Sequence, residues 1–179
     1  MSPIRFARLL APALMAVAIA APAMSQQERY DTIFFRTKLG SFKILGVADK
    51  LAEGRIEMTF TGTVLVNGTP KITPTGSLRR EYYRPEHQQT AYHGTGKLII
   101  DGKFDSIQWF GRDMNAKWTG FGVARLFGEF DKDLNTGEYW YIENPADIHE
   151  WGALGSRTVN NPPSITDYKV IPKARGGGK

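Results

Sequence analysis

The hydrophobic residues of this chain recur most clearly at every second position. From residue 56 to residue 66 these positions carry Ile56, Met58, Phe60, Gly62, Val64 and Val66. The positions between them, from Arg55 to Thr63, carry charged residues and threonine. Because successive side chains of a β-strand point to opposite faces, this alternation predicts a long strand with one face buried.

Shorter stretches later in the chain show the same pattern. Leu98, Ile100 and Phe104 alternate with charged residues, and the segment 139–142 is aromatic and strand-like. No segment after the first 23 residues carries the apolar spacing of an amphipathic helix. The sequence therefore predicts an all-β domain.

Glycines divide these strands at regular intervals. Five residues separate two glycines in each of four segments, 40–46, 62–68, 96–102 and 122–128. Glycine inside a strand marks a bend, a bulge or a close approach of backbones, so its regular use predicts repeated structural units. We expect these units to stack as the coils of a β-solenoid, with glycines at the corners. The alternative is an antiparallel meander or barrel, in which each unit is a hairpin.

The N-terminus has the features of a secretory signal peptide over residues 1–23. Arg5 and Arg8 give it a positive start, and an apolar, Ala-rich stretch follows. Ala21-Pro22-Ala23 then fits the small-x-small pattern that precedes a cleavage site. We expect the protein to be exported to the periplasm, the cell surface or the extracellular space, with no transmembrane segment in the mature chain.

Composition narrows the classes of function. The segment 24–172 is long enough for a single domain with its own core, and we expect residues 173–179, rich in glycine and lysine, to be a flexible tail. The chain has no cysteine, which excludes disulfides, thiol catalysis and cysteine-based zinc sites. Its net charge is +5, but basic and acidic residues alternate instead of forming a basic stripe. We therefore expect no nucleic-acid partner.

Aromatic residues gather in the second half of the chain and are the candidate ligand-binding residues. They are Trp109, Trp118, Tyr139, Trp140 and Tyr141. In a strand Tyr139 and Tyr141 share one face and Trp140 takes the other, so one of the two faces is left with exposed aromatic surface. Exposed aromatic rows bind sugars or apolar ligands, or mediate assembly, whereas buried aromatics fill the core. The sequence leaves both interpretations open.

One segment has the spacing of a calcium-binding loop. Asp131, Asp133 and Asn135 place oxygen-bearing side chains at alternate positions. Gly137 is the seventh residue instead of the sixth, and Ile142 stands at the twelfth place, where an EF-hand has glutamate. A plain hairpin turn is therefore the preferred interpretation, and calcium is the one cofactor that the sequence suggests.

No motif for nucleophilic catalysis or phosphate binding occurs in the sequence. We expect a non-enzymatic structural, adhesive or assembly module of the cell envelope, whose partners are other copies of itself or an envelope polymer. A small-ligand or glycan-binding β protein that uses the exposed aromatics is the alternative, and a glycan hydrolase is the third hypothesis. The glycine-rich texture of residues 94–130 also resembles that of bactofilin-type and putative-adhesin β-solenoids.

Overall fold

The computed structural model describes residues 30–129, 137–150 and 154–164. These residues form the strands β1 (Asp31–Leu45), β2 (Ala52–Asn67), β3 (Lys71–Gly76), β4 (Arg79–Arg84), β5 (Gln89–Phe104), β6 (Ser106–Glu129), β7 (Gly137–Tyr141), β8 (His149–Glu150) and β9 (Leu154–Asn161). A short 3-10 helix, η1 (Pro85–His87), joins β4 to β5. The prediction of an all-β fold is confirmed for the described residues.

The strands form one antiparallel sheet that is not closed into a barrel, so the barrel form of the alternative is wrong. The strand order is β3-β5-β2-β6-β1-β7-β8, while β4 pairs with β5 and β9 pairs with β6. As residue numbers rise along β1 they fall along β6, from Asp31 opposite Gly120 to Leu45 opposite Ser106. Strands that follow each other in the chain are often not neighbours in the sheet, so the order also differs from that of a simple meander.

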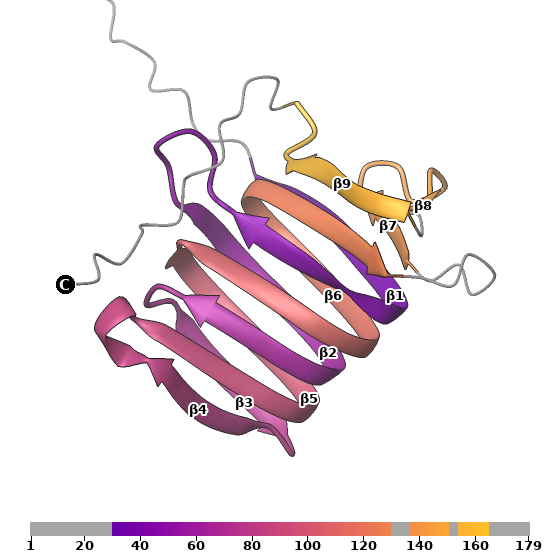
Figure 1. Cartoon of the computed structure of the whole chain (residues 1–179). Coiled ribbons are helices and arrows are strands. Elements are labelled where there is room, and N and C mark those ends of the chain that lie inside the picture. Colours follow the sequence, from indigo (N-terminus) through magenta and orange to yellow (C-terminus); the bar gives the residue numbers. More distant parts are fainter. Residues whose placement is uncertain (1–29, 130–136, 151–153, 165–179) are drawn as a thin grey trace, which may run out of the picture.

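The sheet folds over on itself into two layers, because β1, β2, β5 and β6 each bend near a glycine (Figure 1). Gly40, Gly111, Gly62 and Gly94 lie opposite one another on these four strands, and we call this row the glycine bend. Layer 1 comprises 31–39, 52–61, 95–104 and 112–121 with β3 and β7. Layer 2 comprises 41–45, 63–67, 89–93, 106–110 and 122–129 with β4 and β9.

Gly62, in the central strand β2, shows why the bend requires glycine. Its φ is +155°, and a Cβ atom at this position would overlap the carbonyl oxygen of Phe110 and the Cα of Gly111. Both are backbone atoms of the adjacent strand β6, which cannot rotate away as a side chain would. Two backbones therefore approach at the bend more closely than any other residue type would allow.

The chain winds around the interior in two passages, and the second passage runs back along the first. On the first passage β1, β2 and then β3 with β4 leave a vacant place between successive turns. The chain reverses at η1, and on the return β5 fills the place between β3 and β2 while β6 fills the place between β2 and β1. The return strands β5 and β6 are thus paired on both sides, and β2 of the first passage is paired along both sides by them.

The glycine-bounded segments of the sequence correspond to single crossings of one layer. Residues 41–45 and 63–67 cross layer 2 between the glycine bend and the opposite margin, and residues 97–101 cross layer 1. Six residues of extended chain span about 20 Å, which sets the width of a layer. The spacing of the glycines therefore reflects the distance between the two turning points of the chain.

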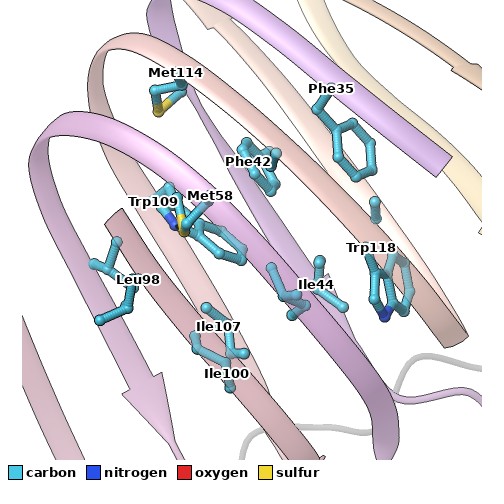
Figure 2. Packing of buried hydrophobic residues seen from close by; sticks show 14 of the residues in the cluster. Phe35, Phe42, Ile44, Met58, Leu98, Ile100, Ile107, Trp109, Met114 and Trp118 are labelled. Carbon is cyan, nitrogen blue, oxygen red and sulfur yellow. Dashed lines mark hydrogen bonds between the residues drawn. The ribbon is translucent and has the colours of Figure 1, made fainter. Parts of the chain in front are cut away.

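Large apolar side chains fill the space between the layers. The largest fully buried ones are Trp109, Trp118, Phe35, Phe42 and Phe104. Phe35 of layer 1 stacks on Phe42 of layer 2 with ring centroids 4.9 Å apart, and Phe42 stacks on Trp109 at 4.2 Å. Figure 2 shows Met58 and Trp109 meeting in this interior from opposite layers, where the Trp109 indole N–H donates to the Met58 sulfur. These contacts hold the two layers together.

Candidate functional site

The five aromatic residues that the sequence singled out divide into two groups in the structure. Trp109 and Trp118 are fully buried, and the Trp118 indole N–H donates to the Glu53 carbonyl oxygen at 3.2 Å. Tyr139 is also buried, whereas Trp140 and Tyr141 are partly exposed. The burial of both tryptophans of β6 favours the core interpretation for them, so they are not available to a ligand at the surface.

Trp140 lies on the outer side of layer 1, but its ring is already engaged. It stacks on Phe34 with centroids 5.3 Å apart and an interplanar angle of 8°, and the Arg36 guanidinium lies 5.7 Å from its centroid. Arg36 also pairs with Glu138 on the adjacent strand β7. Phe34 and Arg36 of β1 thus contact Trp140 and Glu138 of β7, and these four side chains form a cluster that joins the two strands.

Tyr139 and Tyr141 close the space between the layers at the β7–β9 end of the sheet. Tyr139 stacks on His149 at 5.0 Å, and the Arg157 guanidinium lies 5.4 Å from the Tyr139 centroid. The Tyr141 hydroxyl donates to the carbonyl oxygen of Asn160, at 2.5 Å. Burial raises the pKa of both tyrosine hydroxyls above the ordinary value of 10. They remain protonated and join β7 to β9.

The outer face of layer 1 is a ladder of opposite charges. Arg55 contacts Glu57 at 3.0 Å and Asp101 at 3.2 Å, and Lys97 contacts Glu57 at 2.9 Å. Lys103 lies 3.2 Å from Glu53 on the next strand. The hydrogen bond from Lys97, followed by that from Arg55, lowers the pKa of Glu57 to about 2. These cations and carboxylates therefore pair with one another across neighbouring strands.

The outer face of layer 2 has a different composition. Two rows of side chains cross it at right angles to the strands: Thr63, Phe110, Ser41 and Phe127 in one, and Leu65, Gln108, Lys43 and Arg125 in the other. Phe110 is 47% exposed although it follows the fully buried Trp109. We call these eight residues the layer 2 face. Its charged members are both cations.

The layer 2 face was not identified from the sequence, although a signal for it exists. In the segment 123–127 the alternation places Arg125 and Phe127 together, opposite the apolar pair Ala124 and Leu126. Lys43 likewise alternates with two buried residues of β1. What the sequence does not reveal is that these strands are neighbours, because β1 pairs with two separate parts of β6.

The candidate calcium ligands Asp131, Asp133 and Asn135 lie outside the described residues. Within residues 30–129, 137–150 and 154–164, no three His, Asp or Glu side chains converge on a point that could hold a metal ion. The same residues contain no helix of the length and hydrophobicity that crossing a membrane requires. The calcium interpretation therefore remains a prediction from the sequence.

The chain was compared with protein families, curated proteins and solved structures. No family model, no curated protein and no solved structure matches the chain.

Proposed function

We propose that this chain is an exported, non-enzymatic module of the cell envelope, with a structural, adhesive or assembly role. The observation that carries the proposal is that carboxylates and tryptophans of the described residues serve to stabilise the fold. The carboxylates Glu53, Glu57 and Asp101 are paired with cations, and the tryptophans of β6 are in the core. A glycosidase instead needs two carboxyl groups facing each other across a cleft.

The architecture suits a rigid scaffold that presents two outer faces of sheet. The long strands β2, β5 and β6 are paired along both sides, and the stacked interior couples the layers. We regard the double winding of the chain as a solenoid-like arrangement whose return passage fills the gaps of the first. Such a body resists local opening, because few of its backbone groups face solvent along these strands.

Export is proposed from the features of residues 1–23, which precede the described residues. Cleavage after Ala23, or after Ser25 at the second small-x-small site Ala23-Met24-Ser25, would make Met24 or Gln26 the mature N-terminus. The full chain should be expressed in a bacterium, its cell fractions separated, and the intact mass of the recovered protein measured. A processed chain outside the cytoplasm supports the proposal, while a chain that keeps Met1 and stays in the cytoplasm contradicts it.

Binding of a glycan is the second candidate function, and one observation favours it. Phe110 is about half exposed on a face that also carries uncharged hydrogen-bonding side chains and two cations. The aromatic residues that serve this function are then those of the layer 2 face, in place of Trp109 and Trp118.

A further inference from the structure

Two buried polar side chains meet where β1 begins and β9 ends, at one margin of the space between the layers. Asp31 is the first residue of β1 in layer 1, and Asn161 is the last residue of β9 in layer 2. Asp31 shares the inward phase of the buried Ile33, two residues further along the strand. Asn161 likewise shares the phase of the buried Val159. The two side chains therefore point into the interior from opposite layers.

Asn161 has a buried oxygen atom that accepts no hydrogen bond. The residue is fully buried, and its amide nitrogen donates to the backbone carbonyl oxygens of Asp31, at 3.0 Å, and of Trp118, at 3.5 Å. These two acceptors fix the orientation of the amide, because a flipped group would place its oxygen against both carbonyls. The amide oxygen Oδ1 therefore faces another way, and no donor in the described part of the chain reaches it.

Asp31 carries a buried charge with no cation beside it. Only 7% of the residue is exposed, and the Thr32 backbone N–H donates to its Oδ1 at 2.6 Å. Within residues 30–129, 137–150 and 154–164, no lysine, arginine or histidine forms an ion pair with this carboxylate. Burial of a carboxylate is unfavourable unless a cation or a metal ion offsets its charge. A positive charge is thus the group that this margin requires.

Tyr141 borders the same place and supplies no proton to it. Its hydroxyl donates to the backbone carbonyl oxygen of Asn160 at 2.5 Å, so only oxygen lone pairs are left. Burial raises the pKa of Tyr141, and the charges of Tyr139 and Asp31 raise it further, which indicates that the Asp31 carboxylate is close. The side chains at this margin therefore contribute oxygen atoms, and their donor groups are engaged elsewhere.

Calcium is the cation that suits these oxygens best. It accepts carboxylate, amide and carbonyl oxygens in a flexible geometry, whereas magnesium demands a near-ideal octahedron and loses its water reluctantly. A buried water molecule would donate to Asn161 but would leave the charge of Asp31 without compensation. With one carboxylate among neutral oxygens, the expected dissociation constant is that of weak extracellular sites, about 10⁻⁴–10⁻³ M.

We propose that Asp31 and Asn161 hold a calcium ion that links the start of β1 to the end of β9. Asp31 supplies the carboxylate and Asn161 supplies its amide oxygen, while water molecules complete the coordination. The ion thus joins the two layers at this margin and stabilises the attachment of β9. This inference goes beyond the proposed function and does not depend on it, because only residues of the folded domain carry it.

The first test is a thermal melt of the purified protein in chelator and in calcium at about 10 mM, well above the expected dissociation constant. Calcium should raise the melting temperature by about 4 °C or more, because it binds the folded state alone. Magnesium, and sodium at matched ionic strength, should raise it much less. An equal rise with all three cations, or no rise with calcium, overturns the proposal, since water then satisfies the two side chains.

Asp31→Asn separates calcium binding from simple damage to the fold. The substitution keeps the shape of the side chain and removes its charge, so in chelator the variant should be at least as stable as the wild type. In calcium the order should reverse, because the wild type alone gains stability. A variant that is less stable than the wild type by the same amount in both conditions contradicts the proposal.

Two further variants assign the response to this margin. Asn161→Ala should also lose the calcium response, which is read as the difference between two melts of the same variant. Asp133→Asn removes one carboxylate from the segment whose spacing resembles a calcium loop, and it should respond like the wild type. If the response disappears with Asp133→Asn and persists with Asp31→Asn, the segment 131–135 is the calcium site and this inference fails.

Nuclear magnetic resonance locates the ion without relying on stability. During a calcium titration, the side-chain amide of Asn161 and the backbone amides of Asp31 and Thr32 should shift and saturate together. Half-saturation is expected at about 10⁻⁴–10⁻³ M calcium. The amides of Arg55 and Glu57, on the outer face of layer 1, should stay unchanged. Unchanged signals of Asn161 and Asp31 at about 10 mM calcium overturn the proposal.

Discussion

The outer faces of layer 1 and layer 2 are built from the same strands, yet they carry different chemistry. Arg55 and Thr63 are both outward-facing residues of β2, one on each side of the glycine bend. On the layer 1 side every cation of the ladder meets a carboxylate, whereas on the layer 2 side two cations face each other beside phenylalanines. The ion pairs of layer 1 join neighbouring strands, whereas the layer 2 face offers exposed aromatic surface at Phe110.

The difference between the two outer faces requires two separate layers, and these are held together by the side chains packed between them. Replacing Trp109 by alanine removes the indole that stacks on Phe42 and reaches Met58 in the opposite layer. We expect a loss of about 4 kcal/mol in the free energy of unfolding, measured by urea denaturation. Trp140→Ala is the matched control on the outer side and should cost about 1 kcal/mol. Equal losses would mean that Trp109 does not couple the layers.

The comparison depends next on the bend itself. Gly62→Ala forces a Cβ atom into backbone atoms of β6 at a φ that disfavours a side chain, so we expect a loss of about 3 kcal/mol. Gly102 also has a positive φ, +115°, but a Cβ there would meet only Pro70, at 3.9 Å. Gly102→Ala should therefore cost about 1 kcal/mol, from backbone strain alone. Similar urea midpoints for the two variants would show that close packing at the bend is unimportant.

The charged ladder of layer 1 can be tested by pH. The pKa of Glu57 is about 2 in the folded protein and near 4.5 otherwise, so its ionised form stabilises the fold at neutral pH and this stabilisation is lost as pH falls through that interval. Glu57→Gln should cost up to about 1 kcal/mol at neutral pH, since the ion pairs are partly exposed. Thermal melts of both proteins should converge as the pH falls toward 2. A difference that is constant with pH would exclude a charge effect.

The smallest expected effect concerns the edge of layer 1 at β3. The Ser77 backbone N–H donates to the Thr95 carbonyl oxygen at 2.9 Å. Because backbone groups alternate in direction along a strand, the backbone groups of Thr75 and Thr73 also point toward β5, and the backbone nitrogen of Pro74 points to the open edge. Proline at such a position removes a donor from an open edge and hinders pairing with another chain. Pro74→Thr should leave stability within about 0.5 kcal/mol and promote self-association. Sedimentation at rising concentration would show it, and an unchanged monomer would contradict this role.

Much of the fold could be predicted from the sequence, because period two is a local signal. The alternate residues Ile56, Met58, Phe60, Val64 and Val66 are all buried, and the predicted strand at 139–142 overlaps β7, which ends at Tyr141. The pairing of strands could not be predicted, since β2 is joined to β5 and β6 by contacts far apart in the chain. The spacing of the glycines reflects the width of a layer, but it does not predict the direction in which the chain returns.

The candidate site was harder to predict, for the same reason. At Trp109 and Phe110 both phases of the alternation are aromatic, so local pattern does not say which ring is buried. The phase follows from Ile107, which shares the face of Trp109. The opposition of Lys43 and Arg125 on the layer 2 face exists only in the register between β1 and β6. Charge composition alone therefore pointed to no partner.

The most direct measurement of the two-layer architecture is a residue-by-residue map of backbone amide hydrogen exchange. The account predicts the slowest exchange in β2 and β6, which are paired along both sides, and faster exchange in β3 at the edge of the sheet. Equally fast exchange in β2 and β3 would contradict it.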